Sequence, residues 1–179
     1  MTKSLASALL IAAVATASAF GAPPLEIRGL QPGDPAKTFE AVFPGYYCHM
    51  SRGDDADELC LAVGQTFGAI AASYFATAIA DRLASIGVQF DSSDFDVVLS
   101  AVTSKFGPPT RQYTEMVTTG IGVRLQNRIA LWRQPGVSLR LTRYAASAQF
   151  SHLTLEPDDI AARRADVAAR KRPGRLKDM

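Results

Sequence analysis

The sequence has 179 residues, a formal net charge of +2 and a hydrophobic content of 47%. This length suits one domain, and a charged fraction of 20% is ordinary for a globular protein. These values exclude a disordered chain, a collagen-like rod and a polytopic membrane protein. The near-neutral charge also argues against a nucleic-acid-binding protein, which carries a clear basic excess.

Residues 1–19 are typical of a secretory signal peptide. Lys3 gives a positive start, and residues 5–19 contain no charged side chain. Residues 17–19 (Ala-Ser-Ala) match the pattern before a cleavage site, so we expect a mature chain from Phe20. The uncharged run is shorter than the ~20 residues of a membrane span, and no cysteine directly follows it to carry a lipid. An uncleaved anchor is the alternative, but the pattern favours a periplasmic or secreted protein with no transmembrane segment after cleavage.

The only two cysteines of the sequence, Cys48 and Cys60, are separated by eleven residues. In an oxidising compartment such a pair favours a disulfide, and the polar residues between the two cysteines fit a stapled surface loop. A redox site is the competing interpretation, but redox pairs have the Cys-x-x-Cys spacing. We therefore expect a Cys48–Cys60 disulfide.

Residues 20–90 predict one helix followed by extended segments. Asp34 as the cap and Pro35 at the first helical position start this helix, and Pro44 ends it. Extended segments are expected near 46–48 and 59–61 and over 69–79 and 83–90. The alanines of the third segment favour a helix, but the apolar–polar alternation of the fourth is clear. We therefore expect the last two segments to form a hairpin.

Residues 91–155 repeat this order of elements. Ser92 and Ser93 can cap a helix whose apolar residues recur with the spacing of a core-facing stripe. These apolar residues are Phe95, Val98, Leu99, Val102 and Phe106. Four extended segments follow, over 111–118, 121–133, 137–144 and 149–155. The sequence thus predicts an α+β fold in which two tandem helix-plus-four-strand halves form one antiparallel sheet with helices on one face.

Residues 156–179 form a charged segment with seven basic and five acidic residues. Pro157 suits a first helical turn, and Asp159 is spaced to pair with Arg163. The segment predicts a peripheral C-terminal helix that frays after Pro173-Gly174. Contact with anionic lipid or nucleic acid is the alternative to a solvated helix end, but no aromatic residues are interleaved with the basic ones.

The strands of the second half predict a binding face. If the aliphatic residues of segment 121–133 face the helices, the alternate side chains face away from them. These aliphatic residues are Val123, Leu125, Ile129 and Leu131. The outward face would then combine arginines with aromatic residues, the side chains that dominate the energy of protein interfaces. Its expected partner-binding residues are Arg124, Arg128, Trp132, Arg140 and Tyr144. The alternative is an ordinary solvated sheet, or one that the C-terminal segment covers.

The order of helix, Phe-Gly-Pro-Pro and four strands resembles the tandem-repeat fold of the β-lactamase inhibitory protein. It is also similar to small outer-membrane assembly lipoproteins of the SmpA/OmlA type. The local motifs are residues 29–33 (Gly-Leu-Gln-Pro-Gly) and 105–109 (Lys-Phe-Gly-Pro-Pro). The chain lacks the lipobox cysteine of the lipoproteins. The resemblance implies an exported, non-enzymatic protein that binds another protein through its open sheet face.

Catalytic motifs are absent from the sequence. The two histidines, His49 and His152, lie in different halves, and no nucleophile elbow, zinc-protease motif or phosphate loop is present. The acidic run 54–58 does not follow the EF-hand pattern, so we expect no metal and no cofactor. The leading hypothesis is a binding or inhibitory module for another envelope or extracellular protein. The alternatives are an envelope hydrolase or metal protein using His49 or His152 with nearby carboxylates, and a structural envelope protein.

Overall fold

The computed structural model describes residues 22–51, 55–145 and 147–175. The expected signal peptide, with its cleavage site before Phe20, lies outside these residues. The elements, in chain order, are α1 (Lys37–Val42), β1 (Cys48–Met50), β2 (Glu58–Phe67), β3 (Ile70–Ile79), β4 (Arg82–Asp91), a 3-10 turn η1 (Ser92–Asp94), α2 (Phe95–Phe106), β5 (Arg111–Thr118), β6 (Arg124–Gln134), β7 (Val137–Thr142), β8 (Phe150–Pro157) and α3 (Ile160–Arg175).

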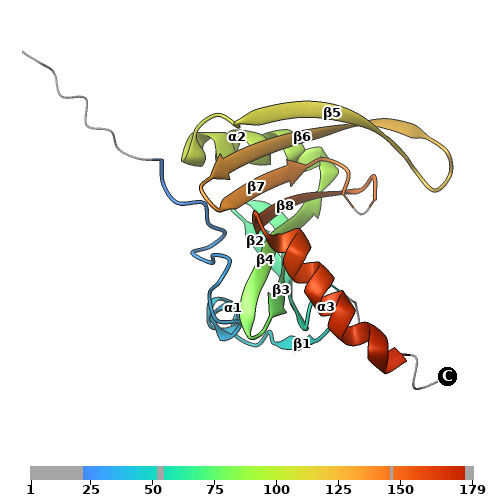
Figure 1. Ribbon diagram of the computed structural model, residues 1–179. Coiled ribbons are helices and arrows are strands. Elements are labelled where there is room, and N and C mark those ends of the chain that lie inside the picture. The colour runs from blue at the N-terminus through green and yellow to red at the C-terminus, as the bar shows by residue number, and fades with distance from the viewer. Residues whose placement is uncertain (1–21, 52–54, 146, 176–179) are drawn as a thin grey trace, which may run out of the picture.

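All eight strands form one antiparallel sheet in the order β1-β2-β3-β4-β8-β7-β6-β5 (Figure 1). The last strand, β8, pairs with β4, so the strands before α2 and those after it join at the middle of the sheet. The β5–β6 hairpin projects beyond the other strands (Figure 1). The structure confirms the α+β class and the single antiparallel sheet. A repeat relation between the two groups of strands stays a prediction.

The core lies between the sheet and helices α1 and α2. The ring of Phe39 on α1 packs against that of Phe43, the residue after the helix, and the Phe43 and Tyr74 ring centroids are 4.7 Å apart. On α2, Phe95, Val98 and Val102 of the predicted stripe are buried, and its other two members are partly buried against the core. The strands supply small and aliphatic residues to this face: Cys60, Ala62, Ala76, Ile86, Val88, Leu139, Leu141, Leu153 and Leu155. Burial of these side chains is the main source of stability.

Both helix caps differ from the expected ones. Asp34 does not cap α1. Its carboxylate accepts a hydrogen bond from the Gln31 N–H at 2.8 Å, because Asp34 lies in the turn before the helix. Helix α2 has no side-chain cap, because the 3-10 turn η1 leads into it. The cap lies one turn earlier, where the Asp91 carboxylate accepts a hydrogen bond from the Ser93 N–H at 2.8 Å at the start of η1. The carboxylate is the stronger acceptor for these unpaired N–H groups.

The predicted facing of β6 is wrong. Trp132, expected to point outward, is only 3% exposed and belongs to the core, and its indole N–H donates to the Gly107 carbonyl oxygen at 2.8 Å. Ala130 shares the core face with Trp132. Because side chains alternate along a strand, Ile129 and Leu131 must point to the opposite side of the sheet. The large indole fills the space beneath α2 that Leu131 was expected to fill.

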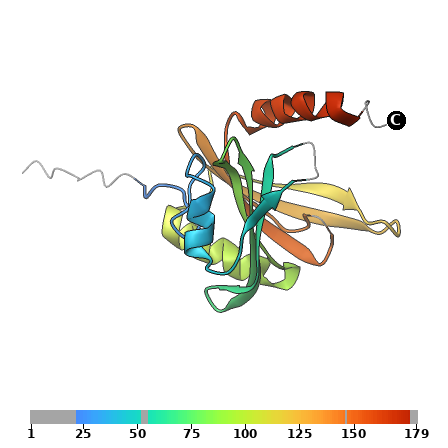
Figure 2. The ribbon, with the colours of Figure 1, turned by 90° about the horizontal axis from the view of Figure 1, so that it is seen from below.

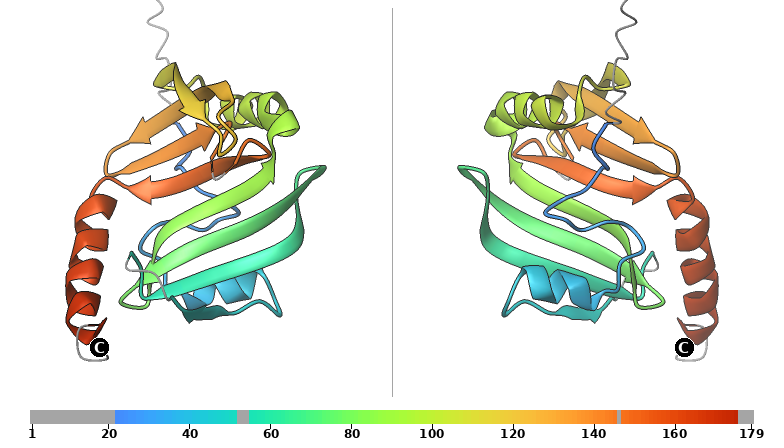
Figure 3. Two further views of the ribbon diagram at one scale, coloured as in Figure 1. Left: turned by 90° about the vertical axis from the view of Figure 1, so that its right-hand side faces the viewer. Right: turned by 90° about the vertical axis from the view of Figure 1, so that its left-hand side faces the viewer.

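Helix α3 lies on the side of the sheet opposite α1 and α2 (Figure 2). It passes the turn between β3 and β4 (Figure 3), where Ile79 and Ala80 line a hollow with residues of the helix. Val167 is fully buried, and the predicted Asp159–Arg163 ion pair is present at 2.9 Å. Arg170 reaches Asp57, 3.5 Å away. Within the described residues, no helix has the length and apolar character needed to cross a membrane.

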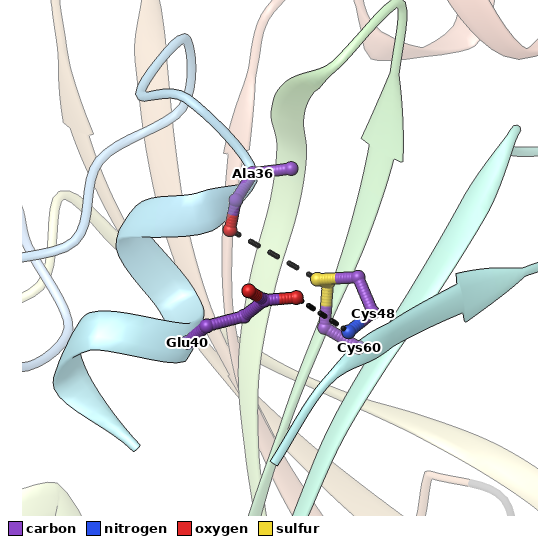
Figure 4. Close-up of a disulfide and its surroundings, with 4 residues drawn as sticks. All are labelled: Ala36, Glu40, Cys48 and Cys60. Carbon is purple, nitrogen blue, oxygen red and sulfur yellow. Dashed lines mark hydrogen bonds between the residues drawn. A yellow bond between two sulfur atoms is a disulfide. The ribbon is translucent and has the colours of Figure 1, made fainter. Parts of the chain in front are cut away.

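The Cys48–Cys60 disulfide is present, as predicted, and joins β1 to β2 (Figure 4). Helix α1 packs beside it, since the Glu40 carboxylate accepts a hydrogen bond from the Cys48 N–H at 3.2 Å. The Cys48 sulfur lies 3.9 Å from the carbonyl oxygen of Ala36. The disulfide therefore fixes the short edge strand β1 and the first helix to the sheet together.

Replacing both cysteines (Cys48→Ala/Cys60→Ala) is expected to lower the free energy of unfolding by ~3 kcal/mol, because the unfolded chain regains the entropy of an open loop. Urea denaturation followed by circular dichroism measures this change. The unmodified protein in reducing buffer is the control and should match the variant. Equal midpoints for the oxidised and reduced proteins would contradict the prediction.

Candidate binding face of the sheet

We call the side of the sheet opposite α1 and α2 the open face. Its residues are identified by strand register, since side chains directly opposite each other on paired strands point to the same side. One row of such pairs crosses seven strands. In the sheet order β2-β3-β4-β8-β7-β6-β5, its members are Leu61, Phe75, Gly87, Thr154, Arg140, Leu131 and Arg111. Helix α3 covers only one end of this face, near Ile79 and Glu156.

Strand β2 contributes large apolar side chains to the open face. Leu59, Leu61 and Val63 alternate along the strand and are 45%, 46% and 48% exposed. The residues between them, Cys60 and Ala62, are fully buried on the core side. We call Leu59, Leu61, Val63 and the neighbouring Phe75 the apolar stripe. A contiguous set of half-exposed aliphatic side chains at strand spacing is typical of a surface that another molecule covers.

Phe75 lies flat over Gly87 of the adjacent strand. A Cβ atom built on Gly87 would lie 2.1 Å from the Phe75 Cζ, so the ring occupies the space that a side chain would take. A glycine inside a strand often marks such a close approach. The glycine thus lets Phe75 extend the apolar stripe across the sheet toward β8.

His152 lies next to Phe75 near the centre of the open face. The two ring centroids are 5.2 Å apart, and His152 Nε2 is 2.9 Å from the side-chain oxygen of Gln89. Burial lowers the pKa of His152, because it disfavours the charged imidazolium. His152 is therefore neutral near pH 7 and is paired with an amide group.

His49, the other histidine, lies on the edge strand β1 opposite Leu59. It is exposed and separated from His152 by several strands. The described residues contain no cluster of three His, Cys, Asp or Glu side chains that could hold a metal ion. Asp54, part of the acidic run, lies outside the described residues.

Two arginines converge on one tyrosine at the other end of the open face. Arg140 donates a hydrogen bond to the Tyr113 hydroxyl at 3.2 Å, and the Arg111 Cζ lies 4.9 Å from the centroid of the Tyr113 ring. Arg111 and Arg140 also flank Leu131, which is only 6% exposed. Both arginines are exposed to solvent. We call Arg111, Tyr113 and Arg140 the arginine cluster.

The structure does not bring the five predicted partner-binding residues together on one face. Arg140 is on the open face, whereas Arg128 and Trp132 are on the core side, where Arg128 pairs with Asp96 of α2 at 2.6 Å. Arg124 has the same strand parity as these two and is exposed near the end of the β5–β6 hairpin. Tyr144 lies beyond the end of β7, where its backbone N–H donates to the Asn127 side chain at 2.8 Å.

Sequence reasoning missed the apolar stripe and two members of the arginine cluster. Leu59, Leu61 and Val63 look like core residues, because they are larger than the alternating Cys60 and Ala62. The expected disulfide could have identified the stripe. If the cystine faces the core, Ala62, two residues from Cys60, faces it too, and the alternate residues Leu59, Leu61 and Val63 face away from it. Arg111 and Tyr113 are separated by one residue on one expected strand, which is the spacing of a shared face.

Comparison of the chain with protein-family models, curated proteins and solved structures finds no match. The resemblance to the β-lactamase inhibitory protein therefore stays a prediction.

Substituting Gly87→Ala is expected to lower the free energy of unfolding by roughly 1–2 kcal/mol, because the new methyl group displaces the Phe75 ring. In a Phe75→Ala background the same substitution should cost nothing, since the obstructing ring is gone. Urea denaturation of the two single variants, the double variant and the unmodified protein gives the coupling energy. A cost of Gly87→Ala that persists without the Phe75 ring would contradict the described packing.

Proposed function

We propose that this chain is an exported, non-enzymatic module that binds another envelope or extracellular protein through the open face of its sheet. The observation that carries the proposal is the apolar stripe. Leu59, Leu61 and Val63 each expose almost half of their surface, side by side on one strand. Exposed apolar area of this kind stabilises a complex when a partner removes it from water.

The composition of the open face supports a protein partner. Apolar and aromatic side chains lie at one end, and arginines with a tyrosine lie at the other. Aromatic residues and arginine are enriched among the side chains that dominate the energy of protein interfaces. The antiparallel sheet supplies a rigid platform, because the core fixes the opposite face of the same strands.

Export is supported by two features. The chain starts with a segment typical of a signal peptide, and the Cys48–Cys60 disulfide suits an oxidising compartment. We further propose that the helix-plus-four-strand groups are tandem halves related to the β-lactamase inhibitory protein fold. That relation is consistent with a binding function but does not identify a partner.

The proposal is tested by replacing Leu61→Asn, with Val97→Asn as the matched control. Val97 is also an exposed aliphatic residue, but it lies on α2 and away from the open face. The unmodified protein, coupled to a resin, should retain a specific protein from an envelope extract of the source cells. We expect Leu61→Asn to reduce the retained amount at least tenfold, because a buried polar amide replaces an apolar contact, and Val97→Asn to leave it unchanged.

Equal retention by the unmodified protein and Leu61→Asn would contradict the proposed function. The folding control is the urea midpoint of each variant. Both substituted residues are exposed, so the two midpoints should stay close to that of the unmodified protein.

A further inference from the structure

The arginine cluster takes no part in the ion pairs of the described residues, which use four other arginines and one lysine. Arg128, Arg163, Arg164 and Arg170 each pair with a carboxylate of the protein itself. Among the described residues, no ion pair includes Arg111 or Arg140. Both arginines are exposed, and both lie against the same tyrosine. Two positive charges are thus held in place on the open face without a negative charge between them.

The hydrogen-bonding capacity of this cluster is largely unused. A guanidinium group has five N–H donors, and the described contacts of Arg140 use one of them, to the Tyr113 hydroxyl oxygen. Because that oxygen accepts a hydrogen bond, its own hydrogen points away from Arg140 and can be donated to another acceptor. Planar guanidinium groups form paired hydrogen bonds with carboxylates, and the stacked ring of Tyr113 fixes the position of Arg111.

We infer that the partner presents an acidic segment to this face, with an aspartate or glutamate side chain bound by Arg111, Arg140 and the Tyr113 hydroxyl. This inference rests on the proposed function and adds the chemistry of the partner. The same segment places an apolar or aromatic side chain on the apolar stripe. Charge complementarity selects an acidic partner, and the stripe requires that partner to carry apolar side chains as well.

The sheet sets the spacing between the two contacts. Arg140 on β7 is three strands away from Phe75 on β3, and four strands away from Leu61 on β2. At about 4.8 Å per strand, these separations are roughly 14 and 19 Å along the sheet. An extended segment that crosses the strands advances about 3.3 Å per residue, so about four to six residues separate its acidic residue from its apolar anchor.

A phosphate-rich surface fits this face less well than a protein segment. Glu115 is on the same face as Tyr113, two residues further along β5, and it would repel a continuous row of phosphates. Half-exposed leucines also have no role in binding a nucleic-acid backbone. The opposite signs of Glu115 and the arginine cluster instead suit a partner with a localised negative charge.

The test is a selection of displayed random 16-residue peptides on the purified protein. We expect the retained peptides to carry an acidic residue about four to six positions from a large apolar residue. Their affinity should fall about tenfold in the Arg111→Gln/Arg140→Gln variant and also in Leu61→Asn. The matched control is Arg124→Gln, which removes an exposed arginine of the same sheet on the other face and should leave the affinity unchanged.

Selected peptides without acidic residues, or equal affinity for the unmodified protein and Arg111→Gln/Arg140→Gln, would overturn the inference. If the double arginine variant keeps its affinity while Leu61→Asn loses it, the proposed binding function stands and the acidic partner does not. If neither variant loses affinity, or if no peptide is retained, both fail. Phosphatidylglycerol vesicles or a single-stranded oligonucleotide that bind through the two arginines but independently of Leu61 would also overturn it.

Discussion

Burial of the indole ring of Trp132 beneath α2 determines what each face of the second half of the sheet carries. Its N–H donates to the carbonyl of Gly107, the residue that ends α2, so this side chain is fixed to the core side by packing and by a hydrogen bond. A buried indole needs such a partner for its N–H. The burial of Trp132 places the alternate residues Ile129 and Leu131 on the open face. Their partners on the neighbouring strands, Tyr113 and Arg140, therefore lie on the open face as well.

The two ends of the open face arise from the same packing. In the first half, α1 and the disulfide lie close to the sheet, so the core side of β2 accepts only small residues such as Cys60 and Ala62. The larger leucines and valine of that strand are consequently left on the open face. In the second half, the core accepts Trp132, and Leu131 lies on the open face between Arg111 and Arg140. An apolar end and a cationic end thus result from how tightly each helix packs.

Much of the fold could be predicted from the sequence. Strand β5 has the predicted bounds, the β3–β4 hairpin forms where Asp81 precedes an alternating segment, and the disulfide is the expected one. Turn residues and alternation are local signals, so they identify elements. The facing of β6 could not be read in this way, because Leu131 and Trp132 are adjacent and both apolar. The choice between them depends on the space beneath α2, which only the assembled tertiary structure defines.

The facing of the sheet is tested most directly by the solvent accessibility of Trp132, the only tryptophan of the chain. The face of β6 that carries Trp132 is the core face, so the proposed partner binds the opposite face of the sheet. Acrylamide quenching of tryptophan fluorescence measures the accessibility. Because Trp132 is buried, we expect a blue-shifted emission and weak quenching that becomes strong in concentrated urea. Strong quenching and red-shifted emission in the folded protein would contradict it, because Trp132 would then lie on an exposed face.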